Sequence, residues 1–447
     1  MDDERAARLN ELIDHGSMEE FHQFYDSMEP IDFAQLISDF DEDTIDKVTT
    51  LMANDDLASL LEQADDDLRI RIAHTLANDR LLIAFGYMQK DDIVDLLGDF
   101  EVGRRKEVIN LMKSGDRKII TDLLKYPEES AGGIMTTAYV SLKANLTVLQ
   151  SLEVIRQIGP RTEVIETLYV VNDTKRLIGS VDLKILLSSP RTTMIGSIME
   201  PSVICVEPET DQEEVAKLVS RYDLNAIPVV SKKKVILGII TVDDVIDVIM
   251  QEYDEDLLQM GGVSREESLD TTLKESVGIR LPWLLINLAT AFLASFTVKL
   301  FESTIAQVVA LSAIMTIVSG MGGNAGTQTV AILVRRLAQG DISWEECKKP
   351  FLKELALGCV DGAVCGAVTG LIVWPVYGNF YLGLIVFLAM IGNLLVSSLF
   401  GFLVPVIIKK LNWDPAIAST IFLTTATDVL GFFIFLGLAT LFMPYLV

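Results

Sequence analysis

Residues 416–443 read AIASTIFLTTATDVLGFFIFLGLATLFM and form the last apolar segment of the chain. A helix needs about 20 mainly apolar residues to cross a bilayer, so this segment is long enough. One carboxylate, Asp428, lies near its centre, behind threonines at positions 420, 424, 425 and 427. A charge at bilayer depth costs ~2.5–3.5 kcal/mol or more. Asp428 is therefore predicted to serve a pore or transport path, with a structural carboxylate that ties two helices together as the alternative.

The charge of the chain is divided unevenly. The 447 residues are 50% hydrophobic and carry a formal net charge of −26. Residues 281–447 contain eight basic and eight acidic residues, so the whole net charge lies in residues 1–280. This division predicts an acidic soluble region followed by an electroneutral membrane region. An acidic surface repels nucleic acid and attracts cations, although it could serve solubility alone.

Residues 1–128 show helical periodicity without a strand pattern. Apolar–acidic–apolar segments recur around Leu36, Leu60 and Leu96, at unequal spacings of 24 and 36 residues. This favours a small superhelix of short helices over a strict solenoid. Asp91 and Asp95 are four residues apart and share one helix face. Acids at the start of this helix also suit its N-terminus electrostatically, which would be a purely structural role.

Residues 127–133, PEESAGG, break the helical pattern and indicate a domain boundary. Beyond it, Ile134-Met135-Thr136 recurs as Ile198-Met199-Glu200, and the pattern at 169–179 recurs 59 residues later at 228–238. Each copy reads as strand, turn, strand and amphipathic helix. The repeat resembles a tandem pair of CBS (cystathionine-β-synthase) domains, which we assign to residues 129–252.

The CBS resemblance carries one nucleotide motif. In that family a G-x-x-[ST]-x-x-D run often contacts a nucleotide ribose, and the second copy has it as Gly238, Thr241 and Asp244. The first copy has Asp182 and Ile185 after Gly179 and so lacks the run. The resemblance implies at most one site, for an adenine nucleotide such as ATP, and a structural turn is the alternative.

An acidic run follows the second copy. Residues 243–256 contain seven acids, and no Lys or Arg occurs between Lys234 and Arg265. Negative charge at the C-terminal end of a helix is unfavourable, so bound cations are the simplest way to neutralise these acids. Hard oxygen ligands of this kind suit Mg²⁺ or Ca²⁺. The glycines at 261 and 262 then interrupt the run, and the chain is amphipathic up to Arg280.

Five apolar spans are predicted, at about 281–301, 305–335, 351–376, 380–408 and 416–443. Basic residues gather between spans two and three and between spans four and five: Arg335, Arg336, Lys348, Lys349, Lys353, Lys409 and Lys410. The positive-inside rule places these loops and the acidic N-terminal region in the cytoplasm. An odd number of spans then places the C-terminus outside.

Span two contains a glycine-rich segment, GMGGNAGTQ at 320–328. Each glycine weakens a helix by ~1 kcal/mol relative to alanine, so we predict a break in the helix. Non-helical backbone at membrane depth is tolerated where it lines a water-filled path, and there its carbonyls could face the hydration shell of an ion. Close helix packing through small residues is the alternative.

The order of these parts resembles the MgtE family of bacterial magnesium channels over essentially the whole chain. The most specific motifs are GGNAGTQ at 322–328 and TDVLG at 427–431. The resemblance implies a homodimer in the bacterial inner membrane, with a pore on the two-fold axis where Asp428 holds a hydrated Mg²⁺. The implied pore residues are Asp428, Asn324, Thr327, Gly323, Thr420 and Thr424. Family members often have Asn at the positions of Thr327 and Thr420, so ion discrimination could differ here.

The same resemblance implies regulation by Mg²⁺. An amphipathic plug or connecting helix, over about 253–277, would close the pore when cytosolic Mg²⁺ bridges the acidic faces of the soluble domains. The implied ligands are Asp91, Asp95, Glu213, Asp223, Asp244, Asp247, Glu252, Glu255 and Asp256, with Asp414 and backbone near Gly133 and Ser220 as further positions.

The expected fold is a multi-domain membrane protein. An all-α superhelical domain (1–128) precedes the α/β tandem CBS pair (129–252), the plug (253–277) and a polytopic α-helical domain with five spans (278–447). No catalytic triad, P-loop or metal-hydrolase motif occurs, so no enzyme activity is expected. The alternatives to a Mg²⁺ channel are an ion-coupled divalent cation exchanger and a membrane-anchored nucleotide sensor.

Overall fold

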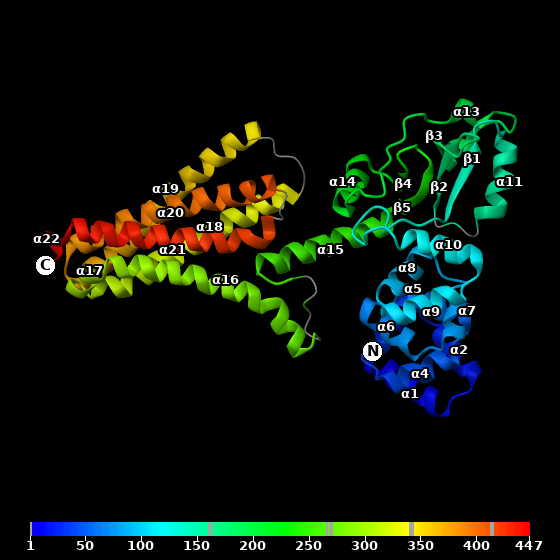
Figure 1. The fold of residues 1–447 in the computed structure, drawn as a ribbon, viewed down its shortest axis with the longest axis horizontal. Coiled ribbons are helices and arrows are strands. Elements are labelled where there is room, and N and C mark those ends of the chain that lie inside the picture. Colours follow the sequence, from blue (N-terminus) through cyan, green and yellow to red (C-terminus); the bar gives the residue numbers. More distant parts are fainter. Residues whose placement is uncertain are drawn as a thin grey trace. The chain divides into compact units, whose positions relative to one another are not determined.

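The computed structural model describes residues 2–159, 162, 164–264, 267, 271–338, 344–411 and 415–447. The chain divides into two compact units, Met1–Ile249 and Met250–Val447. Figure 1 labels the elements of both, and each unit is described by itself below.

The first unit begins with ten short helices. They are α1 (Asp2–His15), α2 (Met18–Tyr25), α3 (Pro30–Ile37), α4 (Glu42–Leu51), α5 (Asn54–Gln63), α6 (Asp66–Thr75), α7 (Asn78–Ala84), α8 (Lys90–Gly98), α9 (Val102–Leu111) and α10 (Ser114–Leu123). Ser17, Asp41 and Asp65 cap three of them by accepting a bond from a backbone N–H three residues later. From α3 to α9 each helix packs against the next but one, and the leucines at 60, 61 and 96 are fully buried. The predicted superhelix is confirmed.

Arginines join helices of this domain at a fixed interval. Arg80 of α7 donates to the backbone oxygens of Thr49 and Met52, at the C-terminal end of α4. Arg104 of α9, 24 residues later, donates in the same way to Ala73 and Leu76 at the end of α6. A cation stabilises the carbonyl end of a helix. The 24-residue interval between these two arginines therefore repeats one structural contact between helices.

The CBS region contains two small sheets. Its elements are β1 (Tyr139–Lys143), α11 (Val148–Ile158), β2 (Val164–Val171), β3 (Leu177–Asp182), α12 (Leu183–Ser188), α13 (Ile195–Ile198), α14 (Gln212–Tyr222), β4 (Ala226–Val230), β5 (Ile236–Thr241) and α15 (Val242–Met260). One sheet has the order β1-β2-β3, with β1 parallel and β3 antiparallel to β2. The strands β4 and β5 form an antiparallel pair.

The two copies share one register. Val170 pairs with Gly179 in the first copy, and Val229 pairs with Gly238 in the second. The repeated Ile-Met segments lie across these glycines. Thr136 exchanges backbone bonds with Ile239, and Glu200 does the same with Ser180. The segment before each copy therefore pairs with a strand of the opposite copy. The pairing lies at Gly179 and Gly238, where a side chain would clash with the backbone of that segment.

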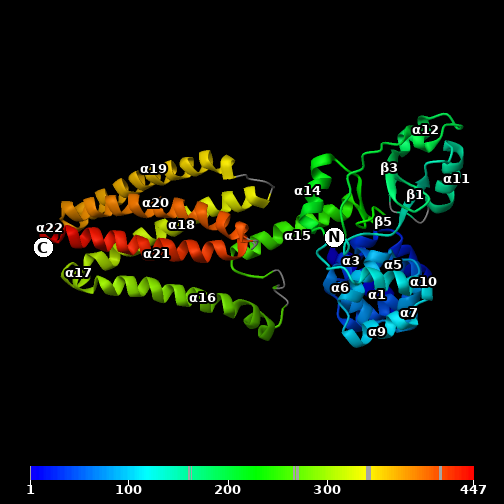
Figure 2. The ribbon, with the colours of Figure 1, turned by 45° about the horizontal axis from the view of Figure 1, so that its top comes forward.

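The second unit is helical. Its elements are the end of α15, then α16 (Leu273–Leu300), α17 (Glu302–Gln307), α18 (Ala310–Ala338), α19 (Trp344–Tyr377), α20 (Phe380–Lys410), α21 (Pro415–Leu441) and α22 (Met443–Leu446). Among the described residues, four helices are long and apolar enough to cross a membrane: Leu273–Leu300, Lys348–Tyr377, Phe380–Lys410 and Thr420–Leu441. Helix α18 is equally long, and it packs against α20 and α21. Figure 2 shows these helices running alongside one another.

The predicted break in span two is wrong, because α18 is one continuous helix through all four of its glycines. A Cβ on Gly322 would lie 2.3 Å from Asn393 Nδ2 of α20, and one on Gly326 would lie 2.5 Å from Leu423 Cδ1 of α21. These glycines serve close helix packing, the alternative weighed above. In an apolar medium an unsatisfied backbone group costs several kcal/mol, which exceeds the helix penalty of glycine.

Helix α19 carries a second set of small residues. Its glycines at positions 358, 362, 366 and 370 recur every four residues, and side chains there would meet the backbone or Cβ atoms of α20. This stripe lets the two helices lie in close contact along their length.

The connecting helix expected over 253–277 is not one helix. Residues 253–260 are the end of α15, and Gly262 follows in a turn with φ of 74°. The next described helix, α16, begins at Leu273 after a capping box formed by Thr272 and Glu275. A positive φ suits glycine alone among the common residues, so the glycines at 261 and 262 divide the segment.

Candidate functional site

Asp428 lies in the middle of α21 and is half-buried. Its Oδ1 accepts a hydrogen bond from the Ser319 hydroxyl of α18, and its Oδ2 makes no hydrogen bond with the described residues. The bond ties two helices together, as the structural alternative requires. It also holds the carboxylate in one orientation while one oxygen stays available to a ligand.

A polar stripe also runs along an exposed face of α18. Thr316, Asn324 and Gln328 are all exposed in the single chain, and they share a face because they are separated by multiples of four residues. Thr327 is also exposed, and its hydroxyl donates to Gly323 O at 2.9 Å. An exposed polar face on a membrane-length helix is costly against lipid, so it needs either water or another protein surface beside it.

Thr424 and Thr427 of α21 bond to their own helix, whereas Thr420 bonds to α15. Thr424 Oγ1 donates to Thr420 O at 3.0 Å, and Thr427, which is fully buried, donates to Thr424 O at 3.0 Å. Thr420 Oγ1 donates to Met260 O at 3.3 Å, at the end of α15. These bonds use the hydroxyl hydrogens and leave the oxygens as acceptors. Asp414 lies outside the described residues.

Sequence reasoning missed Ser319 and two polar residues of α20. Asn393 Nδ2 donates to Val318 O at 2.6 Å, and Ser397 Oγ donates to Gly322 O at 2.6 Å. Both side chains are fully buried, and the glycines of α18 and α21 leave room for Asn393. An amide within an otherwise apolar span could have identified Asn393, by the reasoning that identified Asp428.

A further intramembrane carboxylate was also missed. Asp361 lies in the middle of the Lys348–Tyr377 span and is exposed. It differs from Asp428 because its helix, α19, packs mainly against α20 and does not face α21. The cost of a charge in a span could have identified it as well.

In the first unit, carboxylates from two domains converge. The members are Glu62 of α5, Asp91, Asp92 and Asp95 of α8, and Asp243 and Asp244 at the start of α15. Glu62 Oε1 accepts from the backbone N–H of Gln89 at 2.8 Å and so caps α8. We call these six residues the acidic cluster. Helix capping therefore accounts for Glu62, while the acids of α8 face the CBS pair.

Burial and mutual repulsion shape the titration of the acidic cluster. Burial, together with the charges of Asp91 and Glu62, raises the pKa of Asp92 to about 8. Burial raises the pKa of Asp244 to about 6, against a hydrogen bond from Thr241 that lowers it. Burial also raises the pKa of Asp91, whose Oδ1 is buried without a hydrogen-bond partner among the described residues. The cluster is thus short of positive partners.

Asp95 and Gly133 lie at the edge of the acidic cluster. Burial raises the pKa of Asp95 to about 7, the Arg69 guanidinium lowers it, and the charges of Asp91 and Glu128 raise it further. Gly133 is buried in the loop that follows Glu128, where its N–H donates to Ser130 O at 2.8 Å. The structure therefore brings Asp91, Asp95, Asp244 and this loop into one region.

The remaining predicted ligands of the first unit lie on α14 and α15. Glu213 and Ser220 are seven residues apart on α14, and Asp223 ends that helix in a left-handed conformation with φ of 50°. Glu213 is paired with Lys217 at 2.7 Å. Asp247 is exposed on α15, and burial with the charge of Asp243 raises its pKa.

The predicted ligands Glu252, Glu255 and Asp256 lie on the last turns of α15, in the second unit. Glu255 accepts a bond from the Gln259 amide. Within the described residues no three His, Cys, Asp or Glu side chains are arranged to enclose a metal ion.

The nucleotide motif is engaged in a turn. Asp244 Oδ2 accepts from the Thr241 hydroxyl at 2.5 Å and from the Thr241 N–H at 3.3 Å, at the start of α15. Gly238 lies against Thr136 O, as described above. In this structure the three residues act as a strand-to-helix turn, which was the structural alternative.

Three family models match the chain. The MgtE intracellular N domain matches residues 28–129, the CBS domain matches 131–190 and 195–251, and the divalent cation transporter model of MgtE matches 315–438. A magnesium transporter MgtE of Bacillus subtilis is 31% identical over 443 residues, covering 99% of this chain and 98% of the relative. One from Thermus thermophilus is 33% identical over 75% of this chain and 74% of the relative.

Solved structures resemble the first unit. The soluble part of a magnesium transporter aligns with a TM-score of 0.53 and 30% identity, covering 56% of this chain and 99% of that one. The cytosolic domain of the Mg²⁺ channel MgtE in complex with ATP aligns with a TM-score of 0.52 and 30% identity, covering 54% and 99%.

Proposed function

The chain belongs to the MgtE family of magnesium transporters, and from that premise we propose that it is a Mg²⁺-selective channel for magnesium uptake. Cytosolic Mg²⁺ closes it by bridging its acidic faces. Members of this family are multi-pass transporters and not enzymes. The observation that carries the proposal is Asp428, a carboxylate held by Ser319 of α18 at the middle of a membrane-length helix.

Conduction in this proposal uses a hydrated ion. Mg²⁺ loses its waters reluctantly, so a path lined by hydroxyl, amide and carboxylate oxygens can hold it without stripping its shell. Asp428 supplies the charge, while Asn324 and Thr327 contact the waters. Thr420 and Thr424 extend the path, and Gly323 has no side chain that would narrow it. Because the α18 carbonyls are bonded within the helix, side chains and not backbone oxygens meet the ion.

A homodimer completes the path. The exposed polar stripe of α18 needs a polar neighbour at membrane depth, and a second copy would bring two such stripes and two Asp428 carboxylates together.

The protein crosses the inner membrane five times, with α18 as the second span. The basic residues between α18 and α19 place that side in the cytoplasm and the C-terminus outside.

Closure follows from the acidic cluster. Without divalent ions its carboxylates repel one another and separate the helical domain from the CBS pair. Mg²⁺ at Asp91, Asp95, Asp244 and Asp247, with Glu213, Asp223 and backbone near Gly133 and Ser220, stabilises the compact form. A ligand shifts such an equilibrium only by its differential affinity for the two forms, so several ions that bind the closed form together give a steep response. Glu252, Glu255 and Asp256, with Asp414 as a further position, would carry the change to the pore.

ATP is a proposed modulator at the CBS pair. The candidate contacts are Gly238, Thr241 and Asp244. Asp244 belongs to the acidic cluster as well, so nucleotide and Mg²⁺ would compete for or share this carboxylate. Calorimetric titration with ATP, with and without Mg²⁺, tests this: ATP affinity that is independent of Asp244→Asn would exclude the site.

The test of conduction is Mg²⁺ flux through the purified chain in liposomes. We expect Asp428→Asn to reduce flux at least ~100-fold, since charge stabilisation of an ion at membrane depth is worth several kcal/mol. Asp361→Asn is the matched control, because it removes the other mid-span carboxylate, and we expect flux within about twofold of the parent. Normal flux through Asp428→Asn would overturn the proposal.

The same assay separates the channel from an exchanger. Flux that falls steeply as Mg²⁺ rises on the cytoplasmic side supports closure by Mg²⁺. A rate tied strictly to a Na⁺ or H⁺ gradient would instead indicate ion-coupled exchange.

A further inference from the structure

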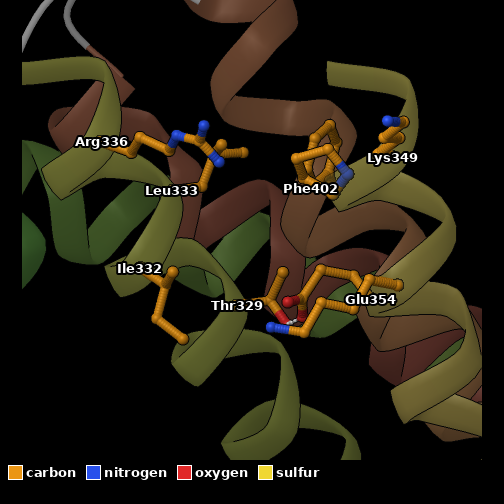
Figure 3. A pocket seen from close by; sticks show the side chains of 9 residues that line it. Thr329, Ile332, Leu333, Arg336, Lys349, Glu354 and Phe402 are labelled. Carbon is orange, nitrogen blue, oxygen red and sulfur yellow. Dashed lines mark hydrogen bonds between the residues drawn. The ribbon is translucent and has the colours of Figure 1, made fainter. Parts of the chain in front are cut away.

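A cavity of about 340 Å³ lies between α18, α19 and α20, away from Asp428. Helix α18 contributes one face to it, through Thr329, Ile332, Leu333 and Arg336, which recur at helical spacing. The first described turns of α19 and one ring from α20, Phe402, complete the wall. Figure 3 shows this arrangement from close by.

Three cations border the cavity: Arg336, Lys349 and Lys353. Figure 3 shows Arg336 and Lys349 on either side of Phe402. One carboxylate, Glu354, also lines the cavity, and it accepts a bond from the Thr329 hydroxyl at 3.2 Å. None of the three cations forms an ion pair with the described residues, so the cavity has an excess of positive charge.

The rest of the wall is apolar. Phe402 is buried, at 3% exposure, and its ring packs against Phe351 with centroids 5.3 Å apart. Leu333 is buried beside it in the same small cluster, whereas Ile332 is 64% exposed. The cavity thus presents a cationic part and a hydrocarbon part to one ligand.

The cavity lies at an end of the spans and not in their middle. The span Lys348–Tyr377 begins at its cationic side, and Arg336 is in the last turn of α18. Near it, Lys409 Nζ at the end of α20 donates to Leu337 O at 2.8 Å, so α18 and α20 end together. This end carries the basic residues that the positive-inside rule assigns to the cytoplasmic leaflet, where bacterial and other membranes expose anionic head groups.

We propose that this cavity binds an anionic phospholipid of the cytoplasmic leaflet. The phosphate contacts Arg336, Lys349 and Lys353, and the upper part of an acyl chain lies along Ile332, Leu333 and Phe402. Basic pockets between transmembrane helices on the cytoplasmic side are suited to lipid phosphates, and the arginine fork can hold two phosphate oxygens. A free phosphate would use the cations but not the apolar wall, so the lipid is the better match.

Bound lipid is measured on the full chain by native mass spectrometry. The chain is reconstituted in nanodiscs of phosphatidylcholine and phosphatidylglycerol and then released into detergent. We expect the parent to retain phosphatidylglycerol in preference to phosphatidylcholine. The double variant Arg336→Gln with Lys349→Gln should retain roughly 30-fold less, at ~1 kcal/mol for each basic residue.

The control variant changes the adjacent residue on each helix, Arg335→Gln with Lys348→Gln. It removes the same charge from the same helices but from outside the cavity, and we expect parent-level retention. Equal loss in the two double variants would indicate unspecific attraction and overturn the site. Undiminished retention in the cavity variant would also overturn it. The charge-conserving pair Arg336→Lys with Lys349→Arg should retain lipid if loss of charge is the cause.

Two further measurements use the parent protein and so do not depend on the folding of a variant. Retention of phosphatidylcholine by the parent at the level of phosphatidylglycerol would exclude an anionic lipid site. Excess inorganic phosphate, added to the lipid-loaded parent, should leave the lipid bound, and displacement with retention of phosphate would show a free-anion site instead. Asp428→Asn should retain lipid as the parent does, so this inference stands or falls separately from the proposed channel.

Discussion

The two units of the molecule place their buried carboxylates in opposite surroundings: one gathers several of them together, and the other keeps a single one apart. In the first unit the acidic cluster brings six carboxylates together with few positive partners, and Asp91 even has a buried oxygen without a hydrogen bond among the described residues. In the second unit Asp428 stands apart from other acids, and Ser319 donates to it. Glycines let α18, α20 and α21 pack closely around this position.

The difference between these regions separates sensing from conduction. A repelling cluster is stable only when protons or cations neutralise it, so its packing depends on the solution. A single carboxylate with its own hydroxyl donor needs no such partner, and its position depends on helix packing instead. We therefore expect the packing around Asp428 to be sensitive to added volume and the packing of the acidic cluster to be sensitive to charge.

The largest effect expected on packing comes from added volume beside Asn393. Gly322→Ala places a methyl 2.3 Å from Asn393 Nδ2, so we expect a loss of ~1–3 kcal/mol in stability and a matching loss of flux. The adjacent Gly323→Ala meets nothing within 4 Å and gains up to ~1 kcal/mol in helix propensity. Thermal unfolding in detergent compares the two. Equal unfolding temperatures would contradict close packing at Gly322.

The glycines of α18 show which features of the structure could be predicted from the sequence. The domain order and the CBS repeat followed from periodicity and spacing, and so did the place of Asp428 within a membrane-length helix, because these signals are local. The continuity of α18 did not follow, because the apolar surroundings outweigh glycine's weak helix propensity. Ser319 and Asn393 were missed since their bonds join residues 109 and 75 positions apart.

Only some members of the acidic cluster were predicted from the sequence. Spacing placed Asp91 and Asp95 on one face, and the motif of the second CBS copy included Asp244. Sequence alone could not show that α8 faces the start of α15, nor that Glu62 and Asp92 join the cluster. That arrangement depends on how two domains pack, which no local pattern records.

The second prediction concerns charge. Above pH 8, where Asp92 is ionised, Asp92→Asn removes a carboxylate that repels its neighbours, so in Mg²⁺-free buffer at that pH we expect slower hydrogen exchange in α8 and the start of α15. The same variant weakens the response to Mg²⁺, and closure should then require about tenfold more of it, within the usual range of coupling energies. Asp39→Asn, on an exposed turn of the same domain, is the control and should change neither measurement. Faster exchange in Asp92→Asn would contradict repulsion in the cluster.

The third prediction is a dependence on pH. The pKa of Asp92 is raised to about 8 and that of Asp244 to about 6, both above the ordinary value of an aspartate. Groups with raised pKa values stabilise packing when protonated, so this contribution is complete at low pH and is lost as pH rises. In Mg²⁺-free buffer, the protection of α8 against hydrogen exchange, taken relative to the intrinsic exchange rate at each pH, should therefore fall gradually from about pH 4 to 8.

Added Mg²⁺ should remove most of this pH dependence, since a cation replaces the protons. Monovalent salt at equal ionic strength is the control, because it screens charges without bridging them. Protection factors in α8 that stay constant with pH in the absence of Mg²⁺ would show that the acidic cluster is not under electrostatic strain.

The smallest expected effect is at Thr327, where one hydroxyl borders the proposed path. Its bond to Gly323 O fixes the oxygen on the exposed face of α18, so Thr327→Val should lower Mg²⁺ flux about two- to tenfold, the worth of one hydrogen bond. Thr327→Ser keeps the hydroxyl and should conduct nearly as the parent does. Thr369 of α19 makes the same local bond, to Cys365 O at 2.8 Å, so Thr369→Val controls for the helix itself and should leave flux unchanged. If Thr327→Val and Thr369→Val reduce flux equally, the loss arises from helix stability, and the polar stripe of α18 does not line the path.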